Sequence, residues 1–168
     1  RKRMAKRSKR PGSRNVPKSR PKTGNRGKIR SIQKEVDGIK FRSLLEVFCY
    51  SKLKEANIKN DYEKHKYVLL QGFHYANSFY EDSGKSGYQD KKKNKIRDIT
   101  YTPDFVDPKG RWIIECKGFA NERFPLKWKM FKNLLMQSDD PPVLFLPRNQ
   151  KQCLETVKAI LELTALTE

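Results

Sequence analysis

The sequence predicts an α/β fold in which a mixed central sheet is flanked by helices. Short runs of β-branched and aromatic residues alternate with longer segments whose apolar residues recur at helical spacing. Along residues 35–168 these segments follow the order α-β-β-β-α-β-α. The stretch is long enough for one domain with one core, and it holds no internal repeat. We therefore expect a single folded domain at residues 35–168, preceded by a tail at residues 1–34.

The first predicted helix covers residues 43–56. Ser43 and Glu46 form an S-x-x-E capping box, in which the glutamate side chain returns to the backbone N–H of the cap. Asn57 is suited to end the helix. Apolar residues recur at helical spacing at Leu45, Cys49, Leu53 and Ala56.

A strand is expected at residues 67–71, and a long irregular insertion follows at residues 72–95. Loops of this length in a compact domain are usually functional or mobile. The run Lys91-Lys92-Lys93 makes the insertion basic. We interpret it as a flap that contacts DNA or, equally well, as a plain solvated loop. Its aromatic residues, which could pack beneath the loop or stack on unpaired bases, are Phe73, Tyr75, Phe79 and Tyr80.

Residues 101–106 and 111–117 are predicted to form a β-hairpin. The intervening Asp107-Pro108-Lys109-Gly110 has proline at its second position and glycine at its fourth, which is typical of a type I turn. Side chains alternate between the two faces of a strand. One face of the second strand therefore presents Trp112, Ile114 and Cys116, and the other presents Ile113, Glu115 and Lys117.

Three further elements complete the predicted fold. Residues 126–137 are predicted to form a helix with Trp128, Phe131 and Leu135 along one stripe. A short apolar strand is expected at residues 143–146. Residues 152–166 then form a last amphipathic helix, whose predicted apolar face is Leu154, Val157, Ile160 and Leu161.

The hairpin brings together the residue types that metal-dependent nucleases use. Glu115 follows Asp104 by eleven positions, and Lys117 completes a PD…(D/E)xK arrangement. Carboxylates hold a hard divalent cation, and the lysine acts near the attacking water or the scissile phosphate. The same triplet also arises by chance on an exposed, charged hairpin. The apolar neighbours favour the nuclease interpretation, because a carboxylate pair among them is costly unless a cation neutralises it.

Glu46 has two interpretations, which the residues alone leave evenly balanced. The capping box explains this glutamate without any catalysis. Alternatively, its carboxylate has a catalytic or metal-positioning role. Both roles are compatible, because a carboxylate in the first turn of a helix also interacts favourably with the helix dipole.

Three segments together resemble the endonuclease I family of T-odd bacteriophages, the four-way-junction resolvases. They are Phe41-Arg42-Ser43-Leu44-Leu45-Glu46, Tyr101-Thr102-Pro103-Asp104-Phe105 and Ile114-Glu115-Cys116-Lys117-Gly118. The stretch from Gly118 to Phe131 is also similar to a group of small phage proteins with the same core. The resemblance covers roughly residues 40–135. It implies a PD-(D/E)xK, restriction-endonuclease-like core whose catalytic positions are Glu46, Asp104, Glu115 and Lys117.

The same resemblance implies a Mg²⁺-dependent endodeoxyribonuclease that hydrolyses phosphodiester bonds of branched DNA. Asp104 and Glu115 would bind one or two Mg²⁺ ions, with Mn²⁺ as an alternative, and Glu46 would complete the metal site. Lys117 would position water or stabilise the transition state. Relatives build each active site from two chains, which implies a homodimer with shared sites. Two other classes stay open: a transposon-end or restriction-type nuclease, and a non-catalytic nucleic-acid-binding protein that retains the fold.

Positive charge is concentrated at the start of the chain. The net charge is +19, from 38 basic and 19 acidic residues, and residues 1–30 hold 14 Lys or Arg and no acid. This leaves 24 − 19, or +5, for the remainder. A segment this basic is expected to be disordered in the absence of a partner and to bind nucleic-acid phosphates. A tail that only increases solubility would have the same composition. The predicted nucleic-acid-binding residues are Arg7, Lys9, Arg10, Arg14, Lys18, Arg20, Lys22, Arg26, Lys28 and Arg30, with Lys91, Lys92 and Lys93 of the insertion.

Cys49, Cys116 and Cys153 are odd in number and far apart in the sequence. We interpret them as small buried residues in a reducing compartment, neither a disulfide framework nor a zinc site. No apolar stretch is long enough to span a membrane. These features predict a cytoplasmic protein, in the bacterial host if the chain is phage-encoded, that is not secreted and has no membrane partner.

Overall fold

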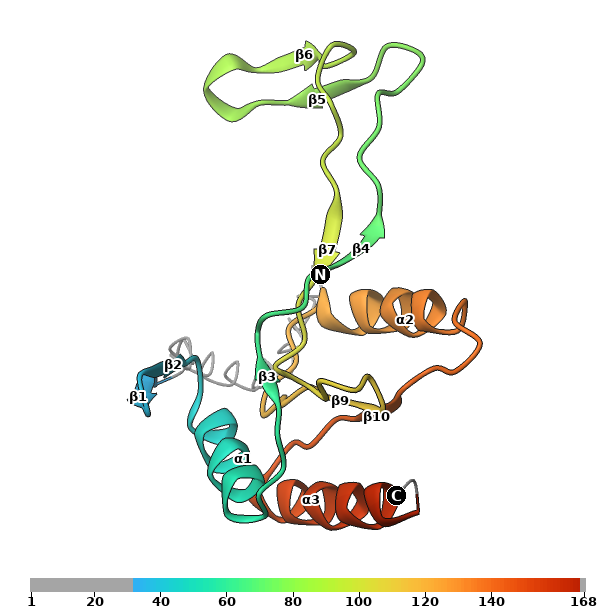
Figure 1. Cartoon of the computed structure of the whole chain (residues 1–168). Helices are drawn as coiled ribbons and strands as arrows, with labels where there is room; N and C mark the ends of the chain where they lie inside the picture. The colour runs from blue at the N-terminus through green and yellow to red at the C-terminus, as the bar shows by residue number, and fades with distance from the viewer. Residues whose placement is uncertain (1–31, 167–168) are drawn as a thin grey trace, which may run out of the picture. The chain divides into compact units, whose positions relative to one another are not determined.

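The computed structural model describes residues 32–166, which belong to one unit of the chain, Ser31–Glu168. The predicted tail at residues 1–34 therefore lies almost wholly outside the described residues. In chain order the described elements are β1 (Lys34–Val36), β2 (Ile39–Phe41), α1 (Leu44–Glu55), β3 (Asp61–Tyr62), β4 (Tyr67–Leu70), β5 (Tyr80–Asp82), the 3₁₀ turn η1 (Gly84–Ser86), β6 (Tyr88–Asp90), β7 (Ile99–Tyr101), β8 (Phe105–Val106), β9 (Trp112–Ile114), α2 (Phe124–Leu135), β10 (Val143–Phe145) and α3 (Gln150–Ala165) (Figure 1).

A mixed four-stranded sheet lies at the centre, in the order β10-β9-β8-β3. β9 is parallel to β10 and antiparallel to β8, and β8 is antiparallel to β3. Backbone hydrogen bonding between the β9 and β10 segments continues past the end of β9. The Glu115 N–H donates to the Phe145 carbonyl at 3.0 Å, and the Lys117 N–H donates to the Pro147 carbonyl at 2.9 Å. The mixed sheet with helices confirms the predicted α/β class.

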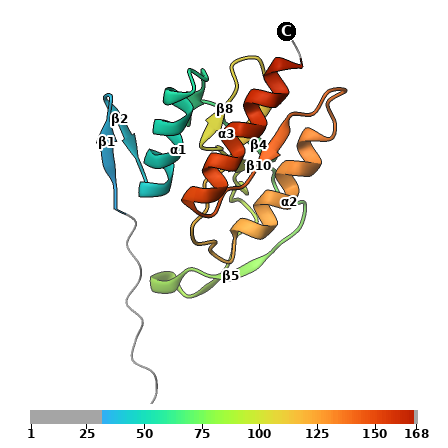
Figure 2. The same cartoon turned by 90° about the horizontal axis from the view of Figure 1, so that it is seen from below.

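Side chains of β9 face two separate apolar clusters, as the predicted alternation requires. Trp112, Ile114 and Cys116 belong to the cluster that α1 and α3 cover, whereas Ile113 belongs to the cluster that α2 covers. The two helices α1 and α3 pack against each other (Figure 2). Both faces of the hairpin are therefore covered, which holds Asp104, before β8, and Glu115, after β9, in a buried setting.

The predicted turn between β8 and β9 is confirmed. The Gly110 N–H donates to the Asp107 carbonyl at 2.8 Å, and Gly110 has φ +77°, a conformation that glycine adopts without steric cost. The buried Asp107 carboxylate accepts hydrogen bonds from Arg111, at 2.7 Å from Nε and 3.1 Å from the backbone N–H. A short chain connection therefore sets the register of the hairpin, and an ion pair with the buried Asp107 closes it.

Several elements differ from the sequence prediction. The β1–β2 hairpin was not predicted, although Asp37-Gly38 has the positive φ values of a two-residue hairpin turn. Residues 72–95, predicted to be irregular, contain the paired strands β5 and β6. The predicted strand at residues 101–106 is interrupted between β7 and β8, where Pro103 lies. The turn at Asp37-Gly38 and the proline at position 103 account for the first and the last of these differences.

The last helix begins two residues earlier than predicted, because Asn149 caps it and accepts a hydrogen bond from the Gln152 N–H at 3.0 Å. Its buried face is also rotated. Val157 and Ile160 are buried as expected, but Leu154 and Leu161 are exposed. Cys153 is buried where the prediction placed Leu154. Within the part of the chain that the structure describes, no helix combines the length and the apolar character needed to cross a membrane.

We predict that Asp107→Asn destabilises the fold by about 1–3 kcal/mol, because the substitution leaves the partly buried donors of Arg111 poorly matched. Burial raises the pKa of Asp107, but the hydrogen bonds from Arg111 and Lys109 outweigh it, so the pKa lies below its usual value. A lowered pKa gives stability that is complete above the ordinary aspartate range and is lost as the pH falls through the folded-state pKa. The measurement is urea unfolding between neutral pH and pH values near 3.

The matched control is Lys109→Ala, at an exposed position of the same turn, which should change stability by no more than about 0.5 kcal/mol. If Asp107→Asn were as stable as the wild type at neutral pH, the ion pair would not contribute to closing the hairpin.

Candidate active site

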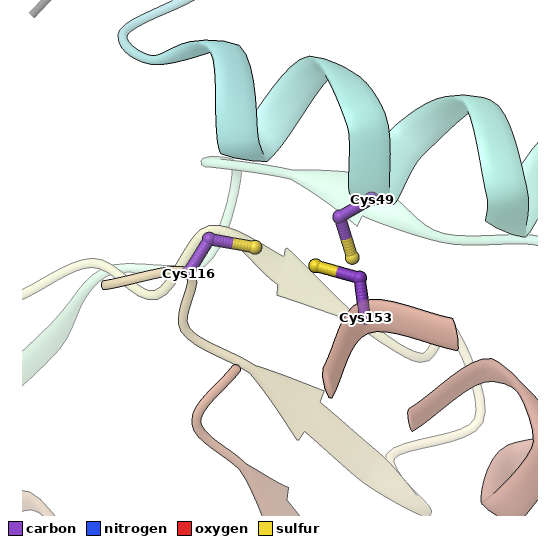
Figure 3. Close-up of side chains that lie close together, drawn as sticks. All are labelled: Cys49, Cys116 and Cys153. Atoms are coloured by element: carbon purple, nitrogen blue, oxygen red, sulfur yellow. The ribbon is translucent and has the colours of Figure 1, made fainter. Parts of the chain in front are cut away.

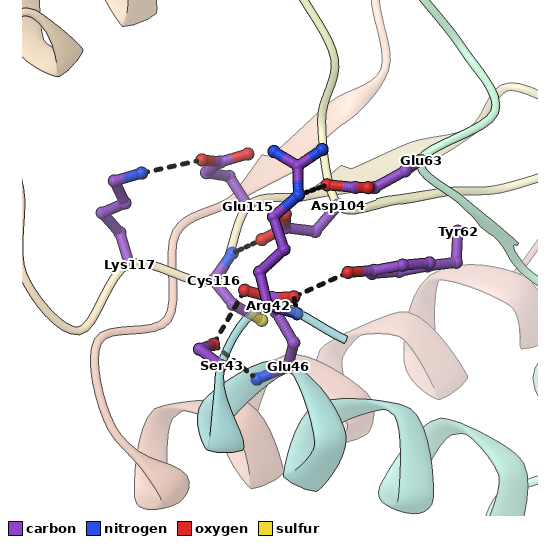
Figure 4. A network of polar contacts seen from close by, with 9 residues as sticks. All are labelled: Arg42, Ser43, Glu46, Tyr62, Glu63, Asp104, Glu115, Cys116 and Lys117. Carbon is purple, nitrogen blue, oxygen red and sulfur yellow. Dashed lines mark hydrogen bonds and ion pairs between the residues drawn. The ribbon is translucent and has the colours of Figure 1, made fainter. Parts of the chain in front are cut away.

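Three carboxylates from separate elements converge beside the β8–β9 hairpin (Figure 4). Asp104 immediately precedes β8, Glu115 directly follows β9, and Glu46 lies in the first turn of α1. All three are buried, with exposed fractions of 7%, 5% and 5%. Buried acids are rare in proteins unless they are paired, hydrogen-bonded or bound to a metal ion. The partners of each carboxylate therefore need to be accounted for.

Asp104 is held by the neighbouring strand. Its Oδ2 atom accepts a hydrogen bond from the backbone N–H of Cys116 at 2.7 Å. Its backbone carbonyl accepts another from the Glu63 N–H at 2.9 Å. Regular pairing between β8 and β9 extends only to Phe105 opposite Ile114, so the aspartate side chain takes the place of the next ladder bond. The carboxylate is thereby fixed between the two strands.

Glu115 and Lys117 lie on the same face of the extended chain, as predicted. The Lys117 Nζ atom is 3.5 Å from Glu115 Oε1, and it also lies over the Phe124 ring, 4.8 Å from the centroid. The second carboxylate oxygen, Glu115 Oε2, is buried and has no hydrogen-bond partner within residues 32–166. The buried Tyr101 hydroxyl makes no close hydrogen bond among these residues, but it faces Glu115 and favours the ionised form of that carboxyl by lowering its pKa. An orphaned carboxylate oxygen in such a setting is an acceptor available to a cation.

Glu46 is fully hydrogen-bonded. Oε1 accepts from the Ser43 hydroxyl at 2.7 Å, while Oε2 accepts from the Arg42 N–H at 2.9 Å and from the Tyr62 hydroxyl at 2.7 Å. Ser43 in turn accepts from the Glu46 N–H at 3.2 Å. The capping interpretation is thus confirmed, with the difference that the glutamate reaches the N–H of Arg42, one residue before the cap. The same carboxylate is close enough to the other two acids to affect their ionisation.

The electrostatic environment favours the neutral forms of two acids. The pKa of Asp104 is raised well above its ordinary value, mainly by burial and then by the negative charges of Glu115 and Glu46. Burial also raises the pKa of Glu115, against the opposing influence of Lys117 and of Tyr101. Three acids thus share a site with one lysine, which leaves an excess of negative charge. A bound divalent cation would remove this conflict.

The donor set fits a hard divalent cation such as Mg²⁺ or Mn²⁺, which binds carboxylate oxygens. Asp104 and Glu115 are the residues that would hold it, because Glu115 Oε2 lacks a partner. The three carboxylates do not close on one point, since only the cysteine group described below has atoms all within 4.8 Å of one another in the described residues. Glu46, whose oxygens are already engaged, therefore suits a positioning role beside the cation.

Four further residues that sequence reasoning did not identify surround the carboxylates. Tyr62 donates to Glu46, and its pKa is raised by burial and by that interaction. The Arg42 Nε atom lies 2.9 Å from Glu63 Oε1 in an ion pair, and Tyr101 faces Glu115. Tyr62 and Glu63 lie in or just after the two-residue strand β3, which is too short to give a periodic signal. Arg42 and Tyr101 do lie within the sequence segments that carry Glu46 and Asp104, which was the available signal.

The predicted nucleic-acid-binding residues separate into two groups. Lys91, Lys92 and Lys93 follow β6 and lie in the connection to β7. The remaining ten, Arg7, Lys9, Arg10, Arg14, Lys18, Arg20, Lys22, Arg26, Lys28 and Arg30, lie outside the described residues.

A family model provides the comparison with known proteins. The model described as "Protein of unknown function (DUF1064)" matches residues 26–140 of the 168-residue chain. The chain belongs to the DUF1064 family. No curated protein and no solved structure matches the chain significantly. The matched range of this DUF1064 chain contains Glu46, Asp104, Glu115 and Lys117, together with the whole insertion at residues 72–95.

A second cluster in the DUF1064 chain consists of the three cysteines. Cys49, Cys116 and Cys153 are all buried and free, and their Sγ atoms lie within 4.8 Å of one another (Figure 3). Their burial was predicted, but their convergence was not. A closed zinc site takes four ligands, and no fourth histidine, cysteine or acid joins this group among residues 32–166. We interpret the thiols as small side chains that let α1 and α3 approach the sheet.

We predict that Asp104→Asn stabilises the DUF1064 chain near neutral pH when divalent ions are chelated. A carboxyl whose pKa is raised in the folded state binds its proton more tightly there, so wild-type stability falls as the pH rises from about 4 through the raised pKa. Asparagine removes this loss and still offers an oxygen to the Cys116 N–H. The variant is expected to gain stability at neutral pH and to show no gain near pH 4. Urea unfolding in EDTA at both pH values measures it.

Asp139→Asn, at an exposed carboxylate, is the control and should leave stability unchanged at both pH values. A less stable Asp104→Asn variant at neutral pH would mean that the ionised carboxylate is a net stabilising group, contrary to the electrostatic argument.

Proposed function

We propose that this chain is a metal-dependent endodeoxyribonuclease with a PD-(D/E)xK core, acting on branched DNA. The observation that carries the proposal is the buried group of Asp104, Glu115 and Glu46 beside Lys117, in which one carboxylate oxygen has no partner within residues 32–166. Such a group is unfavourable for stability and is accounted for by binding of a divalent cation. Mg²⁺ is the expected ion, and Mn²⁺ an alternative.

The sheet supports the assignment of the core. The two acidic positions flank an antiparallel hairpin, Asp104 before β8 and Glu115 after β9, and β10 then joins β9 in parallel. The third acid comes from the N-terminal turn of α1, packed on the face opposite α2. This arrangement agrees with the order and spacing that the resemblance to phage endonuclease I implies. It is the relative placement of the motif on the hairpin, rather than the α/β class, that favours a nuclease.

The chemistry follows from the charges at the site. A bound divalent cation supplies hydroxide near neutral pH and offsets negative charge at the reacting phosphate. Asp104 and Glu115 bind and orient it, and the N–H of Cys116 fixes the Asp104 carboxylate. Ser43 and Tyr62 hold Glu46 in place, and its negative charge adds to that of the other two carboxylates. Lys117, held by Glu115 and the Phe124 ring, places a positive charge where negative charge develops on the phosphate.

The nature of the substrate rests on charge and on the resemblance. The net charge of +19 favours a polyanion, and the acid-free residues 1–30 supply most of it. DNA with branches, including four-way junctions, is what the resemblance to junction resolvases implies. In this structure Glu46 approaches Asp104 of its own chain. A homodimer that shares active sites stays a prediction.

We predict that Asp104→Asn and Lys117→Ala each reduce Mg²⁺-dependent cleavage of a labelled branched DNA by about 100-fold or more, because each removes a charged group from the reacting centre. DNA affinity should stay within a few-fold of wild type, since the phosphate-binding lysines and arginines are retained. The measurement is single-turnover cleavage of a four-way junction beside a linear duplex of matching sequence, with Asp139→Asn as the carboxylate control.

Each outcome of this experiment distinguishes one class. Junction cleavage that the variants lose supports the branched-DNA nuclease, whereas equal cleavage of junction and duplex supports a nuclease of another specificity. Salt-sensitive binding without any cleavage by the wild type would replace the proposal with a non-catalytic DNA-binding protein.

We also predict that Mn²⁺ or Mg²⁺ raises the unfolding temperature of the wild type and not that of Asp104→Asn or Glu115→Gln. A ligand that binds only the folded state stabilises it by about 2.7 kcal/mol at a hundredfold excess over its Kd. The effect should weaken below neutral pH, because the raised pKa values of both acids favour protons over the cation. Thermal denaturation with and without the ion measures this, and equal shifts in all three proteins would contradict the site.

A further inference from the structure

The insertion ends in a small hairpin with two exposed, stacked tyrosines. β5 and β6 pair antiparallel, with Tyr80 opposite Asp90 and Asp82 opposite Tyr88. The rings of Tyr80 and Tyr88 lie 5.7 Å apart with an interplanar angle of 29°. Their exposed fractions are 56% and 74%. Both rings therefore contact each other while most of their surface remains in solvent.

This hairpin has no apolar core of its own, because every residue of β5 and β6 is exposed. Two-stranded hairpins are marginally stable in water without a covered face. Exposed aromatic surface of this kind is typical of a binding surface. Most of each ring is therefore available to a partner with a flat, polarisable face.

The strands that carry the tyrosines contain three acids and no basic residue, and the positive charge of the insertion lies mainly after β6. Residues 73–97 contain six Lys or Arg and three acids, so the net charge is 6 − 3, or +3. Two of the acids are engaged in turns, since Asp82 accepts from the Gly84 N–H and Asp90 from the Lys92 N–H, each at 2.9 Å. Lys92 and Lys93 are exposed, and they form no ion pair with any residue that the structure describes. A partner that combines planar rings with negative charge is a single strand of nucleic acid.

The stem that carries the hairpin is fixed to the catalytic region. β4 and β7 pair antiparallel, and the pairing continues through a bridge between Phe73 and Ile96. The Gly72 N–H donates to Asp98 Oδ1 at 2.7 Å. A Cβ atom at Gly72 would lie 2.6 Å from the Ile96 carbonyl oxygen. The two strands of the stem therefore approach each other too closely for any residue but glycine at this position. β7 then leads directly to Tyr101 and Asp104.

We propose that the β5–β6 hairpin binds unpaired DNA bases at a branch point, with bases stacking on Tyr80 and Tyr88 and the lysines after β6 contacting phosphates. The inference rests on the proposed nuclease function and names its substrate class: branched DNA that carries unpaired nucleotides, such as forks and flaps. A fully paired duplex keeps its bases stacked on one another, so it offers the tyrosines no ring face.

The test measures DNA binding by the full chain in EDTA, where cleavage cannot occur. Fluorescence anisotropy compares a fork with unpaired arms, a fully paired four-way junction and a linear duplex of the same paired sequence. The double variant Y80A/Y88A removes both rings, and Y80F/Y88F retains them. Wild type and Y80F/Y88F should prefer the fork over the duplex. In Y80A/Y88A the affinity for the fork should fall roughly tenfold or more, with duplex affinity unchanged within about twofold.

A cross-linking measurement keeps the test independent of folding defects in the alanine variant. A fork with 5-iodouracil at its first unpaired positions is irradiated with the wild-type chain, and mass spectrometry locates the adduct. Adducts at Tyr80 or Tyr88 support the proposal. Adducts found only elsewhere, an unchanged fork preference in Y80A/Y88A, or tighter binding of a single-stranded RNA than of the DNA fork would each overturn it.

The outcomes separate this inference from the nuclease proposal. Ring-dependent fork binding without any metal-dependent cleavage would retain the binding surface and reject the nuclease. Cleavage that depends on Asp104 but not on the rings would retain the nuclease and reject the binding surface.

Discussion

The candidate site depends on one hydrogen bond, in which the Asp104 carboxylate accepts from the Cys116 N–H at 2.7 Å. Proline at position 103 has no N–H to donate, so regular strand pairing is interrupted between β7 and β8. Beside this interruption, the aspartate side chain supplies the acceptor for the Cys116 N–H. On either side of Cys116, the backbone N–H groups of Glu115 and Lys117 donate to the carbonyls of Phe145 and Pro147. Together with the bond to Asp104, these bonds align residues 115–117. The local backbone and the geometry of the candidate site are thus fixed together.

This arrangement places like charges close together in a buried region, which opposes stability. Burial and mutual repulsion raise the pKa of Asp104, and Lys117 offsets only part of that effect. The fold tolerates the conflict because the hairpin is packed on both faces, by α1 and α3 on one side and α2 on the other. Glu46 is retained for a local reason as well, since it completes the cap of α1. Because Glu46 has both a structural and an electrostatic role, the acids of the candidate site cannot relax away from one another.

The sequence predicted the hairpin well because its signals are local. The turn at residues 107–110 and the alternation of Trp112 and Ile113 depend only on neighbouring residues. It did not predict Tyr62 as a partner of Glu46, nor the meeting of three cysteines, because these contacts join segments far apart in the chain. The face of α3 was partly wrong for a similar reason. Two leucines had the expected period, but the neighbouring α1 selects Cys153 and Val157 instead.

The chain runs from the β5–β6 hairpin through β7 to Asp104, and this connection bears on how the protein would select its substrate. Sixteen positions separate Tyr88 from Asp104, a span of at most about 55 Å if fully extended. That length corresponds to roughly 16 base pairs of duplex at about 3.4 Å per pair. A single branched DNA could therefore contact the tyrosines with its unpaired strand and the carboxylates with a paired arm. Because Gly72 and Asp98 fix the stem between them, the position of the branch would set which phosphate reaches Asp104.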